Sequence, residues 1–182
     1  MEGDRDGLEP EGGGPEVHGE RPTLQDYTAA DAKGLLRTAL LKSQDPTVFF
    51  AHERLMNERG PIPDGEYEIP FGRAEVKREG RDLTIIATGV QVPRALAAAE
   101  TLAKEGISAE VVDPRTLEPL DKETLIASVK KTGRLVVTDE SHDNCSVASG
   151  LAAIAAFLML LVREGPFSAG RAPFDAAQAP GA

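Results

Sequence analysis

The stretch that determines the fold runs from residue 82 to residue 113 and reads DLTIIATGVQVPRALAAAETLAKEGISAEVVD. Residues 82–87 predict a strand, and Gly89 follows it. Pro93 suits the first turn of a helix, and Gly106 ends that helix. The predicted apolar face of the helix consists of Leu96, Ala99, Leu102 and Ala103. Residues 109–112 predict the next strand, so the whole stretch indicates a strand–helix–strand unit with parallel pairing and a right-handed crossover.

A second unit follows along the chain. Asp121 can cap a helix that runs to about Lys131, with Gly133 beyond its end. The inward-facing positions of this helix are predicted to be Leu125, Ile126 and Val129. Residues 134–139 (RLVVTD) predict another strand, and a further helix is expected to begin near Ser146. The fold class predicted is therefore α/β, an open and mostly parallel sheet with helices on both faces.

The upstream region carries shorter signals. Residues 72–77 predict a strand joined to the strand at 82–87 by a turn at Glu79–Gly80. A helix is predicted over residues 31–42, with Thr28 or Asp31 as its cap, and Asp45–Pro46 ends it. Residues 47–50 (TVFF) predict a short buried strand, and the Gly- and Pro-rich residues 57–66 predict a loop or linker.

Both ends of the chain lack the apolar pattern that a packed core needs. Residues 1–26 are acidic and Gly-rich, with a Gly-Gly-Gly-Pro cluster at 12–15, and we expect them to be disordered. His18 lies within this segment and is interpreted as a solvated side chain. Residues 163–182 are dominated by Ala, Pro and Gly, so we expect a tail of low order there.

Composition and charge exclude several kinds of function. The net charge is −10, whereas a protein that binds nucleic acid needs clustered Lys and Arg, so no nucleic-acid partner is expected. A single cysteine, Cys145, fits a reducing compartment. The apolar run of residues 151–162 is shorter than the roughly 20 residues of a membrane span, and no signal peptide is recognisable. We therefore expect that the protein does not bind or span a membrane. Its expected location is the cytoplasm, or the mitochondrial matrix in a eukaryote.

Few residues form a catalytic pattern. GxGxxG, P-loop, CxxC and HExxH motifs are absent from the sequence. The densest polar segment is residues 139–145 (DESHDNC), which follows a predicted strand, where α/β sheets tend to bind ligands. His142 could transfer protons there and Cys145 could act as a nucleophile. The interpretation as a polar loop that caps the next helix through Asn144 or Ser146 is favoured, because no base–nucleophile pair can be oriented from sequence.

Three other positions carry alternative interpretations. Thr88–Gly89 could bind an anion at a helix N-terminus, but a tight turn is the favoured explanation for Gly89. Arg115 could bind an anion or a partner carboxylate, or it could pair locally with Asp113 or Glu118. His52, beside Glu53 and Arg54, is interpreted as a solvated edge or an interface.

The stretches together resemble a known family. The resemblance rests on residues 31–36 (DAKGLL), 45–50 (DPTVFF), 69–74 (IPFGRA), 76–80 (VKREG), 83–89 (LTIIATG), 110–121 (EVVDPRTLEPLD) and 128–140 (SVKKTGRLVVTDE). Their order and spacing are similar to those of the beta subunit of thiamine-diphosphate-dependent 2-oxoacid dehydrogenases of the pyruvate, branched-chain or acetoin type. The resemblance implies that residues 63–162 are a transketolase C-terminal-type domain and that residues 27–62 are a remnant of a pyrimidine-binding domain with its linker.

The same resemblance implies partners and cofactors. In the family a beta subunit joins an alpha subunit and a second beta subunit in a heterotetramer, and it docks on the subunit-binding domain of an acyltransferase core. Thiamine diphosphate and magnesium belong to the full assembly. In some relatives, carbonyl oxygens of one loop hold a monovalent cation, and the matching positions here are Ala39, Leu40 and Asp45, in a loop that is one residue longer.

Departures from the family pattern limit the expected activity. The upstream part, with the family's cofactor-activating glutamate and substrate-proximal histidine, has no counterpart here, and Ala51 stands where the family has a glutamate. After residue 156 the family's usual continuation is also missing, which suggests truncation or a shifted reading frame. We therefore expect no catalytic residues, no cofactor-binding residues and no turnover by this chain alone. The function predicted is a partial beta subunit that contributes assembly and docking. A stand-alone anion-binding or regulatory α/β module and the product of an incomplete gene are the alternatives.

Overall fold

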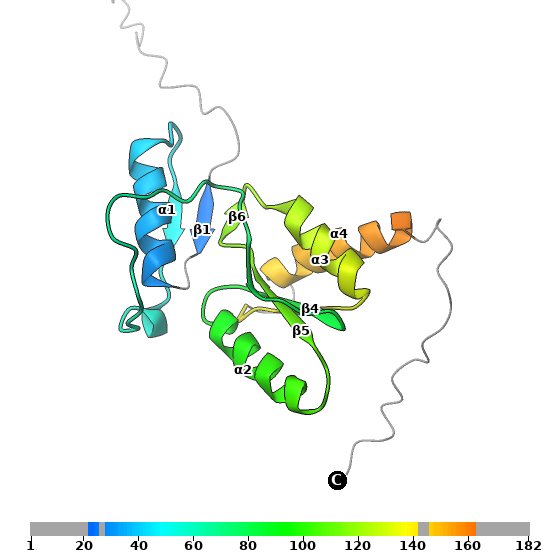
Figure 1. The fold of residues 1–182 in the computed structure, drawn as a ribbon. Helices are drawn as coiled ribbons and strands as arrows, with labels where there is room; N and C mark the ends of the chain where they lie inside the picture. The colour runs from blue at the N-terminus through cyan, green and yellow to red at the C-terminus, as the bar shows by residue number, and fades with distance from the viewer. Residues whose placement is uncertain (1–21, 26–27, 142–145, 163–182) are drawn as a thin grey trace, which may run out of the picture.

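The computed structural model describes residues 22–25, 28–141 and 146–162 (Figure 1). The larger of its two sheets, sheet B, has the strand order β3-β5-β4-β7. These strands are β3 (Glu75–Arg78), β4 (Leu83–Ala87), β5 (Ala109–Asp113) and β7 (Leu135–Thr138). β4 runs parallel to both of its neighbours, β5 and β7, and only the edge strand β3 is antiparallel. The predicted open and mostly parallel sheet is confirmed.

Helices cover both faces of sheet B. α2 (Gln91–Lys104) packs Val92, Ala95 and Ala99 against Ile85 and Val111 on one face. On the other face, α3 (Lys122–Thr132) and α4 (Val147–Val162) contribute Leu125 and Leu151, which pack with Ile86 and Val112. Successive strand residues point to opposite faces, so the neighbouring apolar residues Ile85 and Ile86 of β4 pack into opposite layers. The connection from β4 through α2 to β5 and the connection from β5 through α3 to β7 run in opposite directions across the sheet. Right-handed crossovers therefore place α2 and α3 on opposite faces, as Figure 1 shows.

The apolar helix α4 is too short to cross a bilayer. Within the described residues, no helix combines the length and the hydropathy that a membrane span requires.

The predicted helix boundaries are close to the observed ones. The α1 helix spans Ala29–Leu41, and its N-cap is Thr28, whose side chain accepts a hydrogen bond from the amide of Asp31. Asp121 caps α3 in the same way through the amide of Thr124, and Gly133 ends this helix in the left-handed conformation. Gly106, at φ +81°, follows the end of α2. One position was assigned wrongly to the apolar face of α2, because Ala103 is exposed there while Val92 and Ala95 are buried.

The hairpin predicted at Glu79–Gly80 is wrong. β3 pairs with β5 and not with β4, whose two edges are already occupied by β5 and β7. The chain between β3 and β4 passes instead over the start of β5, where the amides of Arg81 and Asp82 donate to the carbonyl of Ser108. Gly80 lies so close to this strand that a Cβ atom would stand 2.1 Å from the amide nitrogen of Glu110.

A second, three-stranded sheet was only partly predicted. Sheet A has the order β2-β1-β6, with β1 (Thr23–Gln25) parallel to β2 (Val48–Phe50) and antiparallel to β6 (Thr116–Glu118). β1 falls inside the segment 1–26 that was expected to be disordered, whereas residues 1–21 and 26–27 lie outside the described residues. The expectation that the strand at 47–50 is buried is wrong, because β2 is an edge strand with Val48 41% and Phe50 54% exposed.

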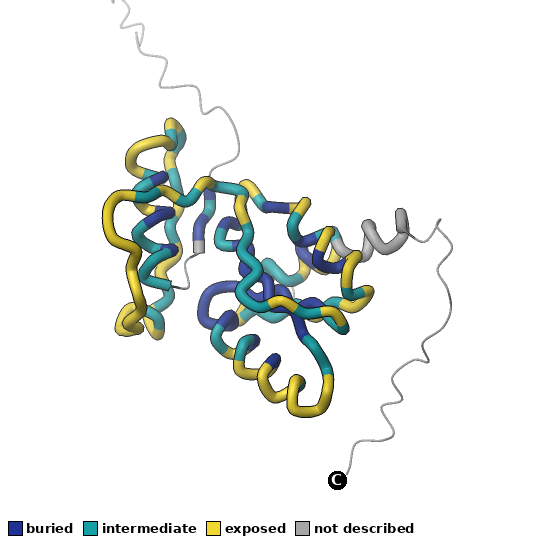
Figure 2. Tube along the Cα trace, in the orientation of Figure 1, coloured by how far each residue is buried: buried dark blue, intermediate teal, exposed yellow. Residues whose placement is uncertain are grey.

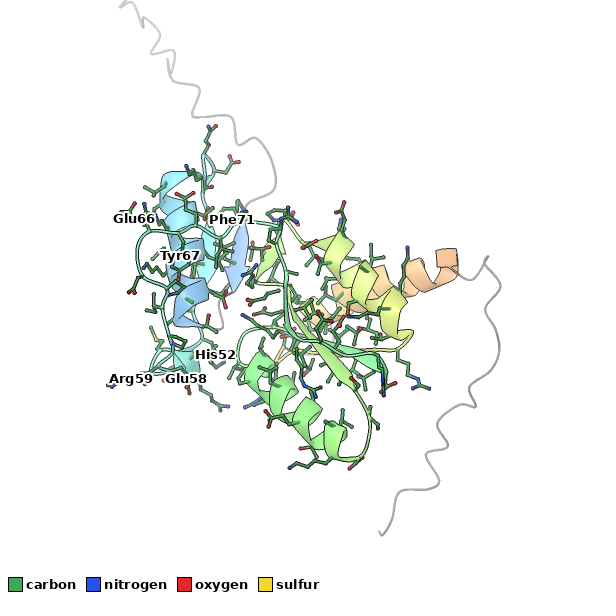
Figure 3. All side chains as sticks on the ribbon, viewed as in Figure 1. His52, Glu58, Arg59, Glu66, Tyr67 and Phe71 are labelled. Carbon is green, nitrogen blue, oxygen red and sulfur yellow. The ribbon has the colours of Figure 1, made fainter. Side chains whose placement is uncertain are left out.

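The α1 helix lies against the segment that leads into sheet B. The hydroxyl of Tyr67 donates to the Ala30 carbonyl at 2.7 Å, and the hydroxyl of Thr38 donates to the Ile69 carbonyl at 2.8 Å. Gly34 allows this close contact, because a Cβ atom there would come within 2.6 Å of the Ile69 side chain. Glu66 and Tyr67 follow the outer side of α1 in Figure 3, so residues 66–69 fasten the helix along its length.

A buried carboxylate joins α1 to sheet B. Asp31 is almost completely buried, and it receives Lys77 Nζ at 2.9 Å and a guanidinium nitrogen of Arg115 at 3.3 Å. Burial alone would raise the pKa of Asp31, but hydrogen bonds from Thr28 and Lys77 outweigh it, so the pKa is lowered. Burial likewise works against the charge of Lys77, yet Glu75 and Asp31 raise its pKa. Both partners therefore remain charged inside the protein near neutral pH.

The first prediction concerns Gly80. Gly80→Ala should lower the free energy of unfolding by about 3 kcal/mol or more, because the new methyl group meets the backbone of β5 and not a side chain that could move. Gly150→Ala is the matched control, since nothing lies within 4 Å of its Cβ position and alanine favours a helix. Urea unfolding of the two variants checks this, and equal stability of both would contradict the packing described.

The second prediction concerns the buried ion pair. Lys77→Met should destabilise the protein by about 3 kcal/mol, because it leaves the Asp31 carboxylate buried with less compensation. The double variant Asp31→Asn, Lys77→Met should recover part of this loss. Chemical denaturation of the single and double variants measures the coupling. Strictly additive effects of the two substitutions would show that the pair does not join the helix to the sheet.

Candidate functional site

The polar segments singled out in the sequence meet at one edge of sheet B. In the parallel register, Ile86 of β4 pairs with Val112 of β5, and Ala87 pairs with Thr138 of β7. The residues that follow these strands, 88–89, 113–115 and 139–141, therefore emerge side by side at the carboxyl ends of the strands. Ligand sites of open α/β sheets are usually located at this edge. Although residues 90–138 separate the first of these segments from the last, the topology brings them together.

The turn after β4 is tight and already hydrogen-bonded. Gly89 has φ +51°, in the region that favours glycine. The amide of Gln91 donates to the Thr88 carbonyl and the amide of Val92 donates to the Gly89 carbonyl, both at 3.0 Å. These first helix amides are thus engaged within the turn, which supports the tight-turn interpretation of Gly89. The hydroxyl oxygen of Thr88 is buried and has no hydrogen-bond partner among the described residues.

Asp113, at the end of β5, is a buried acid. It is 1% exposed, and its Oδ1 accepts a hydrogen bond from the Arg115 amide at 3.0 Å. Its Oδ2 has no partner within the described part of the chain. Burial raises the pKa of Asp113 to about 7, against the lowering influence of the Arg115 amide and of Lys77. The carboxyl group is therefore divided between its neutral and charged forms near neutral pH. No sequence motif indicated this, because the shift depends on tertiary burial.

Arg115 binds carboxylates of its own chain. Its guanidinium contacts Asp31 at 3.3 Å and Glu75 at 3.4 Å, and its Nε donates to the Arg73 carbonyl at 3.0 Å. The guanidinium therefore pairs with Asp31 on α1 and Glu75 on β3, and not with the predicted Asp113 or Glu118, although Asp113 accepts the backbone amide of Arg115. The backbone of Arg115 has φ +57°, which is costly for a residue with a side chain. These contacts hold the residue in place and compensate the strained turn.

A histidine from the segment that follows β2 lies beside the residues that follow β7. His52 Nε2 lies 2.7 Å from Glu140 Oε2, and Arg94 of α2 lies 3.1 Å from the other oxygen of Glu140. The ring Nδ1 of His52 accepts the amide of Arg54, so Nε2 carries the proton that faces Glu140. Figure 3 shows His52 on the side of its unit that faces α2. The prediction of an interface for His52 fits this contact, but its partner is 88 residues away and sequence could not identify it.

A hydroxyl–carboxylate pair lies beneath α3. The Ser128 hydroxyl hydrogen-bonds to the Glu110 carboxylate, and it also meets the Thr84 hydroxyl at 2.8 Å. Ser128 and Glu110 are both almost fully buried. A substrate could not reach this serine, so the pair is a structural network that connects α3 to the sheet.

The predicted cation loop lies at the end of α1. Ala39 and Leu40 are in the last turn of this helix, where the amides of Lys42 and Ser43 both donate to the Thr38 carbonyl. The carbonyl of Asp45 already accepts the hydroxyls of Ser43 at 2.9 Å and Thr47 at 3.4 Å. Two of the three positions thus present carbonyl groups at a helix C-terminus, whereas Asp45 is engaged elsewhere. The cation site stays a prediction.

The polar residues at this edge of sheet B make structural contacts, and their arrangement does not indicate a catalytic site. His142 and Cys145, the candidate proton carrier and nucleophile, lie outside the described residues. Within residues 22–25, 28–141 and 146–162, no three His, Cys, Asp or Glu side chains gather as a metal site. The charged groups that do meet pair with one another across segments that are distant in sequence. These contacts join α1 to β3 and to the turn that follows β5.

Several known proteins are similar in sequence to this chain. The beta subunit of acetoin:2,6-dichlorophenolindophenol oxidoreductase from Cupriavidus necator is 50% identical over 126 residues, which cover 69% of this chain and 37% of the relative. The beta subunit of the pyruvate dehydrogenase E1 component from Bacillus subtilis is 47% identical over 140 residues, covering 76% and 43%. The 2-oxoisovalerate dehydrogenase subunit beta of the same organism is 48% identical over 128 residues, covering 70% and 39%. The chain spans about two fifths of the length of these relatives.

A solved structure and a domain family agree with these similarities. A structure described as a split gene transketolase, inactive beta4 tetramer, superposes with a TM-score of 0.67 at 30% sequence identity, over 75% of this chain and 44% of that chain. The family described as transketolase, C-terminal domain, matches residues 72–169, which include all four strands of sheet B and helices α2, α3 and α4. This chain therefore belongs to the transketolase C-terminal domain family.

Proposed function

We propose that this chain serves as the C-terminal portion of the beta subunit of a 2-oxoacid dehydrogenase, which oxidatively decarboxylates pyruvate or a branched-chain 2-oxoacid. Its own contribution is subunit assembly and docking, not catalysis. The observation that carries the proposal is the identity of 47–50% to three beta subunits over 126–140 residues. These matches are longer than residues 72–169, so they extend beyond the C-terminal domain alone.

Among the described residues, no cluster of side chains offers a metal site for the cofactors of the proposed assembly. Thiamine diphosphate would supply the carbanion chemistry of decarboxylation, and magnesium would bind its diphosphate. The donor set required for the metal is lacking among the described residues, where no three suitable side chains gather. We therefore assign the cofactor to other parts of the assembly, and no reaction step to residues of this chain.

The proposed partners are an alpha subunit and a second beta subunit in a heterotetramer. The net charge of −10 also suits docking on a basic subunit-binding domain of an acyltransferase core. Within the chain, residues 27–62 would be the remnant of a pyrimidine-binding domain with its linker, and residues 63–162 the transketolase C-terminal-type domain. The proposal places the assembly in the cytoplasm, and it retains Ala39 and Leu40 as carbonyl ligands of a monovalent cation.

A structural role for Asp113 follows from this proposal. An acid with a pKa of about 7 at the carboxyl edge of a sheet could suggest general acid–base catalysis. However, Asp113 is almost fully buried and contacts the backbone of Arg115 beside the Asp31–Lys77 pair. We assign it to the joint between α1 and sheet B.

The third prediction is the pH dependence of stability at Asp113. Its pKa rises from 3.8 to about 7 on folding, so the folded state binds this proton more tightly than the unfolded state. Ionisation of Asp113 therefore lowers stability progressively as the pH rises from about 4 to about 7. Asp113→Asn keeps the acceptor for the Arg115 amide and removes this loss. The Tm of the variant relative to the original chain should increase over that pH window and stay level above it, whereas a difference independent of pH would contradict the buried, neutral acid.

The fourth prediction tests assembly. The chain should co-elute with a cognate alpha subunit in size-exclusion chromatography with light scattering, and the isolated chain should not decarboxylate pyruvate or 2-oxoisovalerate. Cooperative urea unfolding of the isolated chain serves as the folding control.

Other outcomes separate the alternatives. Turnover by the chain alone would overturn the non-catalytic role. A monomer that ignores the alpha subunit, but whose Tm rises with phosphate or sulfate, would favour the stand-alone anion-binding module.

A further inference from the structure

Five charged side chains gather where α1 adjoins the carboxyl edge of sheet B. Asp31 of α1 contacts Lys77 of β3 at 2.9 Å and Arg115 at 3.3 Å, and Glu75 of β3 contacts the same two cations. Asp113 belongs to the group as well, because β3 and β5 pair Glu75 with Asp113, and Asp113 accepts the amide of Arg115. Apart from Glu75, these side chains are largely buried, so their charges have to balance within the protein. We call these five residues the joint cluster.

The net charge of the joint cluster depends on one proton. When Asp113 is neutral, the two carboxylates of Asp31 and Glu75 face two cations, and the charges balance. When Asp113 is ionised, three carboxylates face the same two cations, and one negative charge is left in excess. Burial raises the pKa of Asp113 to about 7, so the balanced and the unbalanced states have similar populations at neutral pH.

The groups that face Asp113 are the joint cluster and an apolar layer. The charges that act on Asp113 are those of Lys77, Asp31 and Arg115. Alternation along β5 points Asp113 into the layer between sheet B and α2, where Val92 packs against the sheet. β5 is buried along its whole length, as its dark blue tube in Figure 2 shows. Water therefore contributes little to stabilising the ionised carboxylate in this state.

Lys77 is the cation that connects two carboxylates of the joint cluster. It donates to Asp31 Oδ2, and its charge also acts on Asp113. The Oδ2 atom of Asp113 is buried and has no hydrogen-bond partner among residues 22–25, 28–141 and 146–162. We propose that the joint cluster is a pH-sensitive joint: α1 is held on sheet B while Asp113 carries a proton, and loss of that proton draws Lys77 from Asp31 toward Asp113 and loosens α1.

The direction of the pH effect follows from the attached and detached states of α1. With α1 in place, Asp113 keeps its proton up to about pH 7. Displacement of α1 removes Asp31 and admits water, so the carboxyl of Asp113 returns toward its ordinary pKa of 3.8. The attached state binds the proton more tightly, so detachment becomes easier as the pH rises from about 4 to about 7, by up to about tenfold per pH unit, and levels off above it. This inference goes beyond the proposed function, because it requires no partner subunit and no oxoacid.

The fifth prediction is a pH-dependent release of α1. In amide hydrogen exchange, corrected for the intrinsic dependence of exchange on pH, residues 35–38 of α1 should be less protected than residues 84–86 of β4, because α1 opens without the sheet. The protection of residues 35–38 should fall at least about tenfold between about pH 5 and about pH 7, and change little above that range. Asp113→Asn removes the titrating group, so in this variant the same protection should change less than about threefold.

Glu110→Gln is the matched control. Glu110 is the other acid of β5 and is also buried, but its partners Ser128 and Lys131 lie on α3, outside the joint cluster. The loss of protection in α1 should therefore persist in this variant. A second measurement needs no variant: in NMR spectra of the original chain, the Asp113 carboxyl carbon and Lys77 Nζ should titrate with the same midpoint, because one event changes both.

Three results would overturn the proposal. The first is a protection of residues 35–38 that does not change with pH in the original chain, or that changes equally in Asp113→Asn. The second is equal protection of α1 and β4 at every pH, which would show that the proton of Asp113 affects only the stability of the whole chain. The third is a Lys77 Nζ signal that does not follow the Asp113 carboxyl carbon, which would show that Lys77 keeps Asp31 as its partner.

Discussion

The contact between Asp31 and the two cations Lys77 and Arg115 is the constraint on which the arrangement of the two sheets depends. Asp31 belongs to the first turn of α1, Lys77 to β3 and Arg115 to the turn after β5, so a single carboxylate connects three segments. A charge in this position is favourable only while its partners are present, because burial without them would be costly. Thr28 completes the set, since it caps α1 and also hydrogen-bonds to the same carboxylate. The same two residues, Thr28 and Asp31, therefore both cap α1 and attach it to sheet B.

Charged residues at the carboxyl edge of sheet B are also paired with other residues of the chain. Arg115 follows β5 and Glu140 follows β7, and each contacts a side chain from a different element, whereas Asp113 at the end of β5 accepts the amide of Arg115. Edges of this kind often hold ligands in α/β proteins, but here the charged groups are largely occupied by internal partners. This occupancy agrees with the proposed role of the chain in assembly and not in catalysis.

The sequence was sufficient for elements whose signals are local. The helices at 29–41 and 122–132 begin at side-chain caps, and the helix at 91–104 has a proline in its first turn. Each has an apolar face and a glycine or proline beyond its end, and these signals predicted the helix limits closely. The pairing partner of β3, the exposure of β2 and the strands β1 and β6 depend on contacts with distant residues, so local patterns could not predict them. At the site, the sequence predicted the tight turn at Gly89. It also predicted that Arg115 binds a carboxylate, but not which carboxylates these are. The buried state of Asp113 and the His52–Glu140 contact arise only from the tertiary fold.

Strand β6 has a consequence for how this protein can be divided. It lies between β5 and α3 in the sequence, within the matched C-terminal domain, yet its hydrogen bonds are made to β1 at the opposite end of the chain. Dividing the chain near residue 62 would place β1 and β6 in different parts, although these two strands are hydrogen-bonded to each other. Shortening this protein to the matched domain would leave β6 as a solitary strand, because its pairing partner β1 lies upstream of residues 72–169.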